Sequence, residues 1–491
     1  MAVTTVLAAA AGCGGGSPTT SGLDQFYRQH VEWSSCQGFS AHDKALEDAG
    51  MRCARITVPL DYDKLDGKTV SLAVSRLPAS GQRVGALLTN PGGPGGPGLL
   101  LPLMLAKSAV AQRFDVIGVD VRGLGSSTPA VVCQTPEEFQ AERSDSEADH
   151  SPAGIAAIES KRKKLADECV ERTGMDLLEH VGTVEVARDF DVVRAALGDD
   201  KLNYLGMSYG TRIGSTIAEL YPTRVRAMVL DGGIDPNSYM IDQVAMATGF
   251  QHAFDAYSTA CATTPDCPLG SDAAKATDRA RALLDPLVEH PVPAADNRQL
   301  GYRDAMNGVL NSLYNPGQWP GITKGLTELA QGRGDTLLRL ADLVAQPGTV
   351  SRDLQHAVLC TEDERITDRA RAADLDRRSR AAAPIADDGH GTDQAPLDLC
   401  AFWPVPARSH PHVPAVAGLP KTVVVGTTGD PATPYAGGVN LARDLGATMV
   451  TYEGVQHGVF GEGVACVDDP VTRYLVDLTP PQEDLHCPAA T

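Results

Sequence analysis

Apolar and polar residues alternate in the first part of the chain in a pattern typical of β-strands. Residues 54–62 (ARITVPLDY) and 69–77 (TVSLAVSRL) alternate in this way and carry β-branched side chains, so they predict a leading pair of strands. Residues 85–90 (GALLTN) predict a third strand, and 114–121 (FDVIGVDV) predict a buried one. The chain therefore opens with β-structure.

Helices enter the pattern in the second hundred residues. A helix predicted at 183–197 precedes an apolar strand that begins at Leu202. A second helix at 211–221 ends at Pro222, and the next strand follows at 225–231. Strands that alternate with helices predict an α/β fold with a mostly parallel, doubly wound sheet.

This alternation stops between residues 236 and 420. Helices dominate there, at 243–260, 274–288 and 323–345, and strands resume at 421–427 and 448–452. An interrupted sheet predicts a helical cap inserted over the carboxyl ends of the strands, where open α/β sheets bind ligands. The predicted parts are a leader and linker (1–30), a first part of the core (31–235), the cap (236–420), and a second part of the core with a disulfide-tied tail (421–491).

Composition and charge indicate which kinds of ligand the chain can bind. The 491 residues are 43% hydrophobic and 21% charged, which indicates a folded chain with a substantial core. There are 42 Lys and Arg against 62 Asp and Glu, so the formal net charge is −20. Such a surface repels nucleic acid and anionic lipid headgroups, and we expect neither as a ligand. Every apolar run is shorter than the ~20 residues that a membrane-spanning helix needs.

The first residues are similar to an export signal. An apolar run at 3–11 leads into Ala10-Ala11-Gly12-Cys13, which resembles a bacterial lipobox, and a Gly/Ser/Pro/Thr linker follows. Ala10 stands where a lipobox usually has Leu, and no Lys or Arg precedes Arg28. We interpret Cys13 as a candidate lipidation site and the chain as exported, either attached to the cell envelope or secreted. The alternative is a disordered Ala/Gly leader.

The cysteines support an oxidising compartment. Besides Cys13 there are ten, with no C-x-x-C motif and no Cys/His spacing typical of zinc sites. They predict disulfides rather than a metal centre, and we expect neither a metal nor a cofactor. The sequence leaves the connectivity open, but pairing neighbours along the chain avoids links between distant modules. The predicted pairs are Cys36–Cys53, Cys133–Cys169, Cys261–Cys267, Cys360–Cys400 and Cys466–Cys487.

A candidate nucleophile lies in residues 201–212 (KLNYLGMSYGTR). An apolar strand there meets Gly206-Met207-Ser208-Tyr209-Gly210, and a helix follows at once. The pattern G-x-S-x-G between a strand and a helix is typical of a sharp turn that exposes a nucleophilic serine, and the small flanking residues avoid clashes. Ser208 is the predicted nucleophile. The alternative is a glycine-rich turn whose serine merely caps the helix.

A serine hydroxyl needs a general base whose pKa lies near neutrality, which histidine supplies. Of the 12 histidines, His457 alone lies just beyond a late strand in a glycine-rich loop. Asp430 ends the preceding strand, in a loop stiffened by prolines, and is predicted to orient the imidazole. Asp231 also ends a strand and is the rival acid. The alternatives without catalysis are a solvated loop histidine and a helix-capping aspartate.

Residues 91–98 form a loop of glycines and prolines after the third strand. The loop matches the G-x-G-x-x-G pattern of dinucleotide-binding folds. However, Pro94 and Pro97 lack the N–H groups that would face a pyrophosphate, so we disfavour a nucleotide site. A loop that lets its backbone approach a reacting carbonyl fits better. The predicted oxyanion donors are the N–H groups of Gly93 and Tyr209.

Four motifs of the chain occur together: N-P-G-G-P-G (90–95), D-x-R-G-x-G-x-S (120–127), G-x-S-Y-G-T-R (206–212), and D-P-A-T-P (430–434) with Gln456-His457. Together they resemble a known family, the exported tripeptidyl-aminopeptidase-like α/β-hydrolases of actinobacteria, which are relatives of prolyl iminopeptidases. The resemblance covers nearly the whole chain from about Val31 and is close to the mycobacterial envelope serine protease type. It implies an α/β-hydrolase fold with a helical cap, and Ser208, Asp430 and His457 fall on the family's triad positions.

The resemblance also implies peptide or protein substrates that are entered from their free N-terminus. Such an enzyme needs a fixed anion in the cap to pair with the substrate's α-ammonium, and this pairing sets how many residues precede the cut. Glu362 and Asp363, beside Cys360, are the candidates, and we take Glu362; ordinary solvated acids are the alternative. An envelope carboxylesterase or lipase with the same triad is the enzymatic alternative. A surface-anchored binding module without turnover is the non-enzymatic one.

Overall fold

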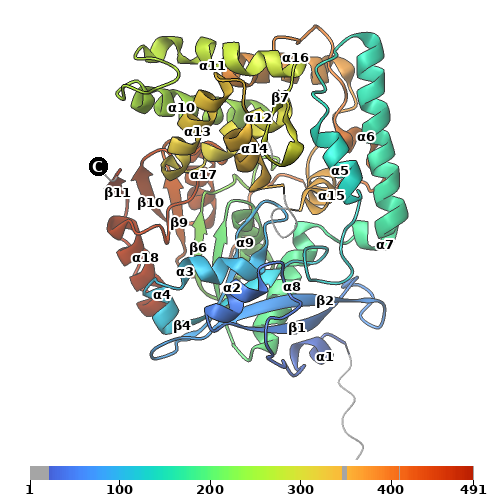
Figure 1. The fold of residues 1–491 in the computed structure, drawn as a ribbon. Coiled ribbons are helices and arrows are strands. Elements are labelled where there is room, and N and C mark those ends of the chain that lie inside the picture. Colours follow the sequence, from blue (N-terminus) through green and yellow to red (C-terminus); the bar gives the residue numbers. More distant parts are fainter. Residues whose placement is uncertain (1–21, 241, 346–350, 409, 490–491) are drawn as a thin grey trace, which may run out of the picture.

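The computed structural model describes residues 22–240, 242–345, 351–408 and 410–489, and the candidate lipidation site Cys13 lies outside them. Within these ranges, nine strands form one sheet in the order β1-β2-β4-β3-β5-β6-β9-β10-β11 (Figure 1). The strands are β1 (Arg52–Pro59), β2 (Thr69–Leu77), β3 (Gly85–Asn90), β4 (Phe114–Asp120), β5 (Leu202–Met207), β6 (Val225–Asp231), β9 (Val423–Thr427), β10 (Thr448–Glu453) and β11 (Leu485–Pro488).

The strand directions agree with the prediction from the sequence. β2 is antiparallel to both β1 and β4, whereas every other neighbouring pair in the sheet is parallel. A mostly parallel, doubly wound sheet is thereby confirmed. β11, which pairs with β10, was not predicted, because its four residues (LHCP) carry little apolar pattern.

Helices cover both faces of the sheet, and the strand residues alternate between two cores. Leu88 of β3 packs into one core and Leu87 into the other, as the two-residue period of a strand requires. The helices are α8 (Thr183–Ala196), α9 (Tyr209–Leu220) and α17 (Tyr435–Leu445) on the first face, and α3 (Leu101–Leu105), α4 (Val110–Arg113) and α18 (Ala465–Asp477) on the second.

Most of the helices between β6 and β9 share a hydrophobic core of their own and lie at the top of Figure 1, but the helix at residues 352–362 packs its apolar side chains into the first core of the sheet. Phe254, Val309 and Leu326 are fully buried there. This separate core is what a cap would need, although the boundaries of the cap stay a prediction. The helices are α10 (Gln243–Cys261), α11 (Ala276–Leu284), α12 (Tyr302–Ser312), α13 (Trp319–Leu329), α14 (Asp335–Asp342), α15 (Arg352–Glu362) and α16 (Arg369–Ala382).

The single helix predicted at 323–345 is wrong, because the structure has a turn between α13 and α14. Gly332 in this turn has a φ of +77°, and a Cβ on Gly334 would lie 2.4 Å from Cβ of Leu300. Glycine therefore serves both the backbone conformation and the close packing. The two glycines were a signal of this break in the sequence, although no proline accompanies them.

Two helices that follow β4 in the sequence lie beside the inserted helices (turquoise in Figure 1). They are α5 (Pro136–Arg143) and α6 (Pro152–Thr173). Arg143 is buried and binds Asp304 of α12 at 2.9 Å and Asp342 of α14 at 2.8 Å. A buried guanidinium requires such partners, so these ion pairs fasten α5 to the inserted segment.

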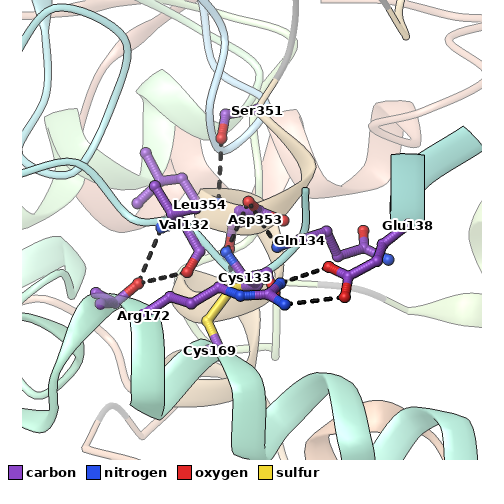
Figure 2. Close-up of a disulfide and its surroundings, with 10 residues drawn as sticks. Val132, Cys133, Gln134, Glu138, Cys169, Arg172, Ser351, Asp353 and Leu354 are labelled. Carbon is purple, nitrogen blue, oxygen red and sulfur yellow. Dashed lines mark hydrogen bonds and ion pairs between the residues drawn. A yellow bond between two sulfur atoms is a disulfide. The ribbon is translucent and has the colours of Figure 1, made fainter. Parts of the chain in front are cut away.

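All five predicted disulfides are present, with the neighbour pairing predicted above. Cys133–Cys169 ties the loop before α5 to α6 (Figure 2). Asp353, at the start of α15, accepts a hydrogen bond from the Cys133 N–H at 2.8 Å. The bridge therefore also supports the N-terminus of α15.

Removing the Cys133–Cys169 bridge by a double alanine substitution should destabilise the fold more than removing Cys261–Cys267 in the same way. The sequence separations are 36 and 6, and the entropy of loop closure grows with length. We expect losses of about 4 and about 2 kcal/mol, measured by urea unfolding. Equal losses would show that local packing, not loop closure, sets the contribution of the bridges.

Candidate active site

Ser208 lies in the turn between β5 and α9, with a φ of 55° and a ψ of −122°. Residues other than glycine rarely adopt this conformation, and it marks functional turns. The Ser208 N–H donates to the carbonyl of Asp231 at 2.9 Å. A Cβ on Gly206 would lie 2.3 Å from the Gly210 carbonyl oxygen, so small residues are required on both sides. The turn has the strained form predicted from the sequence.

His457 follows β10 and Asp430 follows β9, so the two residues lie in loops at the same edge of the sheet. His457 Nδ1 is 2.9 Å from Oδ1 and 3.0 Å from Oδ2 of Asp430. The N–H groups of Ala432 and Thr433 each donate to Oδ1 at 2.9 Å and hold the buried carboxylate in place. Since Nδ1 faces the carboxylate, Nε2 is the nitrogen that can take a proton from a nucleophile.

Two glycines bring the imidazole close to the turn that carries the serine. Gly232 follows Asp231, whose carbonyl accepts the serine N–H, and a Cβ on Gly232 would lie 3.3 Å from His457 Cε1. A Cβ on Gly458 would lie 3.0 Å from Cε of Met207. The structure thus gathers the three predicted triad residues at the carboxyl ends of β5, β9 and β10.

The surroundings of His457 act on its pKa in opposite directions. Burial lowers the pKa, because the charged ring loses hydration, but the charge and hydrogen bond of Asp430 raise it, and the charge of Asp231 adds to the increase. The net effect is a pKa above the ordinary value of 6.5. The site therefore favours the imidazolium that forms when the histidine accepts a proton.

Asp231, the rival acid, does not bind the imidazole. It is fully buried at the end of β6, and its Oδ2 accepts the N–H groups of Val459 and Phe460 at 2.8 Å each. Burial raises the pKa of Asp231 to about 6, although the two N–H donors oppose this change. Asp231 thus anchors the backbone just after His457. The geometry favours Asp430 as the orienting acid.

The Gly/Pro-rich loop after β3 lies against the serine turn. Gly92 has a φ of +91°, and a Cβ there would lie 2.5 Å from the Met207 carbonyl oxygen and 2.7 Å from Cβ of Ser208. Tyr209 is the first residue of α9, so its N–H lacks an intrahelical acceptor. The predicted oxyanion donors, Gly93 and Tyr209, therefore belong to neighbouring segments. Their role stays a prediction.

Sequence reasoning missed two residues of the site. Thr433 Oγ1 donates to Asp430 Oδ2 at 2.8 Å and lies 3.2 Å from His457 Nδ1. Tyr314, from the inserted segment, accepts the His457 N–H through its carbonyl at 2.8 Å, and its ring packs edge-on against the imidazole at 5.2 Å. The D-P-A-T-P motif contains Thr433 and could have signalled it. No local pattern marks Tyr314, because its contact forms only when the inserted segment folds back.

Glu362, the predicted partner of a substrate ammonium, is buried at the end of α15. Its Oε1 accepts the N–H of Thr183 at 2.7 Å, and the Thr183 hydroxyl lies 3.0 Å from the hydroxyl of Tyr209. The neighbouring Asp363 accepts the N–H of Met240 at 2.6 Å. The structure places Glu362 near the serine turn, and its ammonium-binding role stays a prediction.

Residues 85–464 match the family model of the alpha/beta hydrolase fold. The chain belongs to the alpha/beta hydrolase family. "Serine protease Hip1" of Mycobacterium tuberculosis is 44% identical over 475 residues, which cover 94% of this chain and 91% of the relative. "Carboxylesterase B" of the same species is 46% identical over 466 residues (93% and 89%), and "Tripeptidyl aminopeptidase" of Streptomyces lividans is 32% identical over 489 (94% and 88%).

These relatives confirm the resemblance stated from the motifs and the reading of the chain as a serine hydrolase. They match this hydrolase along nearly its whole length, so the similarity includes the inserted helices as well as the sheet. The roles of individual residues rest on the geometry described above.

Replacing Asp430 by Asn should lower kcat roughly 10⁴-fold, because the amide holds the wrong imidazole tautomer. The base must be neutral, so kcat/KM rises as the pH passes the pKa of His457, which lies above 6.5. Loss of the Asp430 carboxylate should lower the pKa of His457, so the rise of kcat/KM should occur at lower pH. Initial rates measured against pH test both effects, with Asp231→Asn as the matched variant that should retain more activity. A near-normal rate in Asp430→Asn would transfer the orienting role to another acid.

Replacing Gly92 by Ala should lower kcat roughly 10²-fold, about the cost of losing one oxyanion donor. The new methyl would meet Met207 and Ser208 and displace the loop from the serine turn. Gly301→Ala is the control, because a Cβ there meets open space. Turnover and circular dichroism of both variants are the measurements. Full activity in Gly92→Ala would show that the loop does not need this close approach.

Proposed function

We propose that this hydrolase is an exported serine peptidase that releases short peptides, tripeptides foremost, from the N-terminus of peptides and proteins. The observation that carries the proposal is the 2.9 Å contact between His457 Nδ1 and Asp430 beside the strained serine turn. The relatives named as a serine protease and a tripeptidyl aminopeptidase support peptides as the substrate class.

The first half-reaction forms an acyl-enzyme. Ser208 Oγ attacks the scissile carbonyl carbon while His457 Nε2 takes the hydroxyl proton. Asp430 keeps the ring oriented and stabilises the imidazolium. The N–H groups of Gly93 and Tyr209 hold the oxyanion of the tetrahedral intermediate. Collapse of this intermediate breaks the C–N bond, and the imidazolium gives its proton to the leaving amine.

The second half-reaction releases the short peptide. His457 removes a proton from water, whose oxygen attacks the ester carbonyl of the acyl-enzyme. The second tetrahedral intermediate uses the same two N–H donors. Its collapse breaks the bond to Ser208 Oγ, which recovers its proton from the histidine. Free enzyme and a new peptide carboxylate result.

The position of Glu362 supports cleavage counted from the N-terminus. It is joined through Thr183 to Tyr209, which directly follows the nucleophile. An extended tripeptide spans about 10 Å, so a carboxylate a few side chains away from the serine lies at a suitable separation. Pairing of the substrate ammonium with this acid would decide where the chain is cut.

Export follows from the chemistry of the cysteines. Five disulfides persist only in an oxidising compartment in most organisms. Within the described ranges, we find no helix with the length and apolar character needed to cross a bilayer. Attachment to the envelope would then depend on a lipid at Cys13, and secretion is the form without it.

An envelope carboxylesterase is the second candidate function. The 46% identical relative named Carboxylesterase B favours it, and the same triad cleaves esters. An ester differs from a peptide in needing no protonation of an amine leaving group and no anion for a substrate ammonium. Blocking the substrate N-terminus therefore separates the two functions.

A tripeptide arylamide, its N-acetylated form and an acyl ester of the same arene, each given to the enzyme and to Ser208→Ala, test the proposal. We expect cleavage of the free arylamide, strong loss upon N-acetylation, and at least ~10³-fold lower kcat in Ser208→Ala. Efficient ester cleavage without arylamide cleavage would favour the esterase. No labelling of Ser208 by a fluorophosphonate would favour a binding module without turnover.

A further inference from the structure

A cavity of about 770 Å³ lies between α15, α16 and the loop that follows β6. Ser238 of this loop lines the cavity, and its carbonyl accepts a hydrogen bond from Arg212 of the nucleophile helix α9 at 2.7 Å. Arg352, the first residue of α15, also lines the cavity. The cavity is large enough for several amino-acid residues of a bound peptide.

Arg352 is unlike the other arginines of this cavity. Arg371 binds Glu364 at 2.5 Å, and Arg378 lies 3.6 Å from Asp374. The guanidinium of Arg352 has no hydrogen bond or ion pair with any residue in the described ranges, although the side chain is partly buried. A guanidinium has five N–H donors, and a partly buried donor without an acceptor destabilises the folded protein. The side chain is thus prepared for an anion that comes from elsewhere.

The surroundings of Arg352 hold acids, but these are occupied. Glu142 binds Arg303 at 2.7 Å, while Asp304 and Asp342 bind Arg143. Burial lowers the pKa of Arg352, and the charges of Arg303 and Arg143 lower it further, whereas Glu142 acts in the other direction. The residues just before α15, 346–350 (QPGTV), contain no acid.

Arg352 stands close to the catalytic groups. Its neighbour Ser351 donates its N–H to the carbonyl of Gly95 in the oxyanion loop at 2.9 Å. The positive charge of Arg352 also acts on Tyr314, whose pKa burial raises to about 12, and the ring of Tyr314 packs on His457. The start of α15 is held by Asp353 and the Cys133–Cys169 bridge (Figure 2). An anion on Arg352 would therefore lie on the side of the cavity that adjoins the oxyanion loop and Tyr314.

We propose that Arg352 binds a carboxylate of the peptide substrate beside the cleaved bond, and so directs the enzyme toward peptides with an acidic group at that point. The inference rests on the proposed peptidase function and adds a specificity to it. The carboxylate has two sources, an acidic side chain flanking the cut or the free C-terminus of a short substrate. A planar guanidinium fits either one with paired hydrogen bonds.

Matched peptides with a free N-terminus test the inference. One set carries Glu or Gln at the third or the fourth residue, and a second set has a free or an amidated C-terminus just after the cut. We expect the wild type to favour the carboxylate member of at least one pair by roughly tenfold or more in kcat/KM, the value of a charge-assisted hydrogen bond. The pair that responds identifies the source.

Two variants at position 352 and one control assign the preference. Arg352→Gln should bring the ratio of acidic to neutral substrate close to one, and Arg352→Lys should retain part of it. Arg378→Gln also removes a positive charge from this cavity, but Arg378 already lies 3.6 Å from Asp374. This variant should therefore leave the ratio unchanged. Using a ratio of two substrates makes the result independent of any general loss of active enzyme.

A wild-type ratio near one for every pair would overturn the inference. So would a ratio that survives in Arg352→Gln, or one that disappears equally in Arg378→Gln. Failure of the proposed function looks different, because no peptide of either set would then be cleaved. That result would remove the inference together with the peptidase function.

Discussion

The pairing of Asp430 with His457 is the interaction on which the rest of the site depends. The imidazole is largely buried, and a charge formed there during proton transfer is tolerable only beside a fixed counter-charge. The sheet provides this geometry, since Tyr452 of β10 pairs with Thr427 of β9 and the two strands end at the same level. The loops that follow the two strands therefore lie side by side, which brings the Asp430 carboxylate into contact with the His457 ring.

Buried polar groups hold the surrounding loops in place without taking part in the chemistry. Asp231 binds the backbone after His457, and Asp120 accepts the N–H groups of Leu99 and Ser126. Arg122, fully buried, binds Asp189 at 2.6 Å and carbonyls of three further residues. The D-x-R-G-x-G-x-S motif is therefore a structural support for the carboxyl edge of the sheet.

The inserted helices do more than cover the sheet. Tyr314 binds the backbone of His457 and packs on its ring, and Ser351 binds the oxyanion loop. Both sides of the proposed reaction centre thus touch the insertion. Arg352, which we propose selects substrates, begins a helix whose start is held by Asp353 and the Cys133–Cys169 bridge.

The order of residues along the chain was enough to predict every strand of the sheet except β11, the turn of Ser208, the loops of Asp430 and His457, and the disulfide pairs. These features depend on side-chain periodicity, on glycine and proline, and on the sequence in which strands follow one another. Tertiary structure alone decided that Asp430 rather than Asp231 faces the imidazole, and that Tyr314 and Arg352 stand beside the site. Those outcomes depend on contacts between distant segments, and such contacts form only once both segments have packed against the same sheet edge.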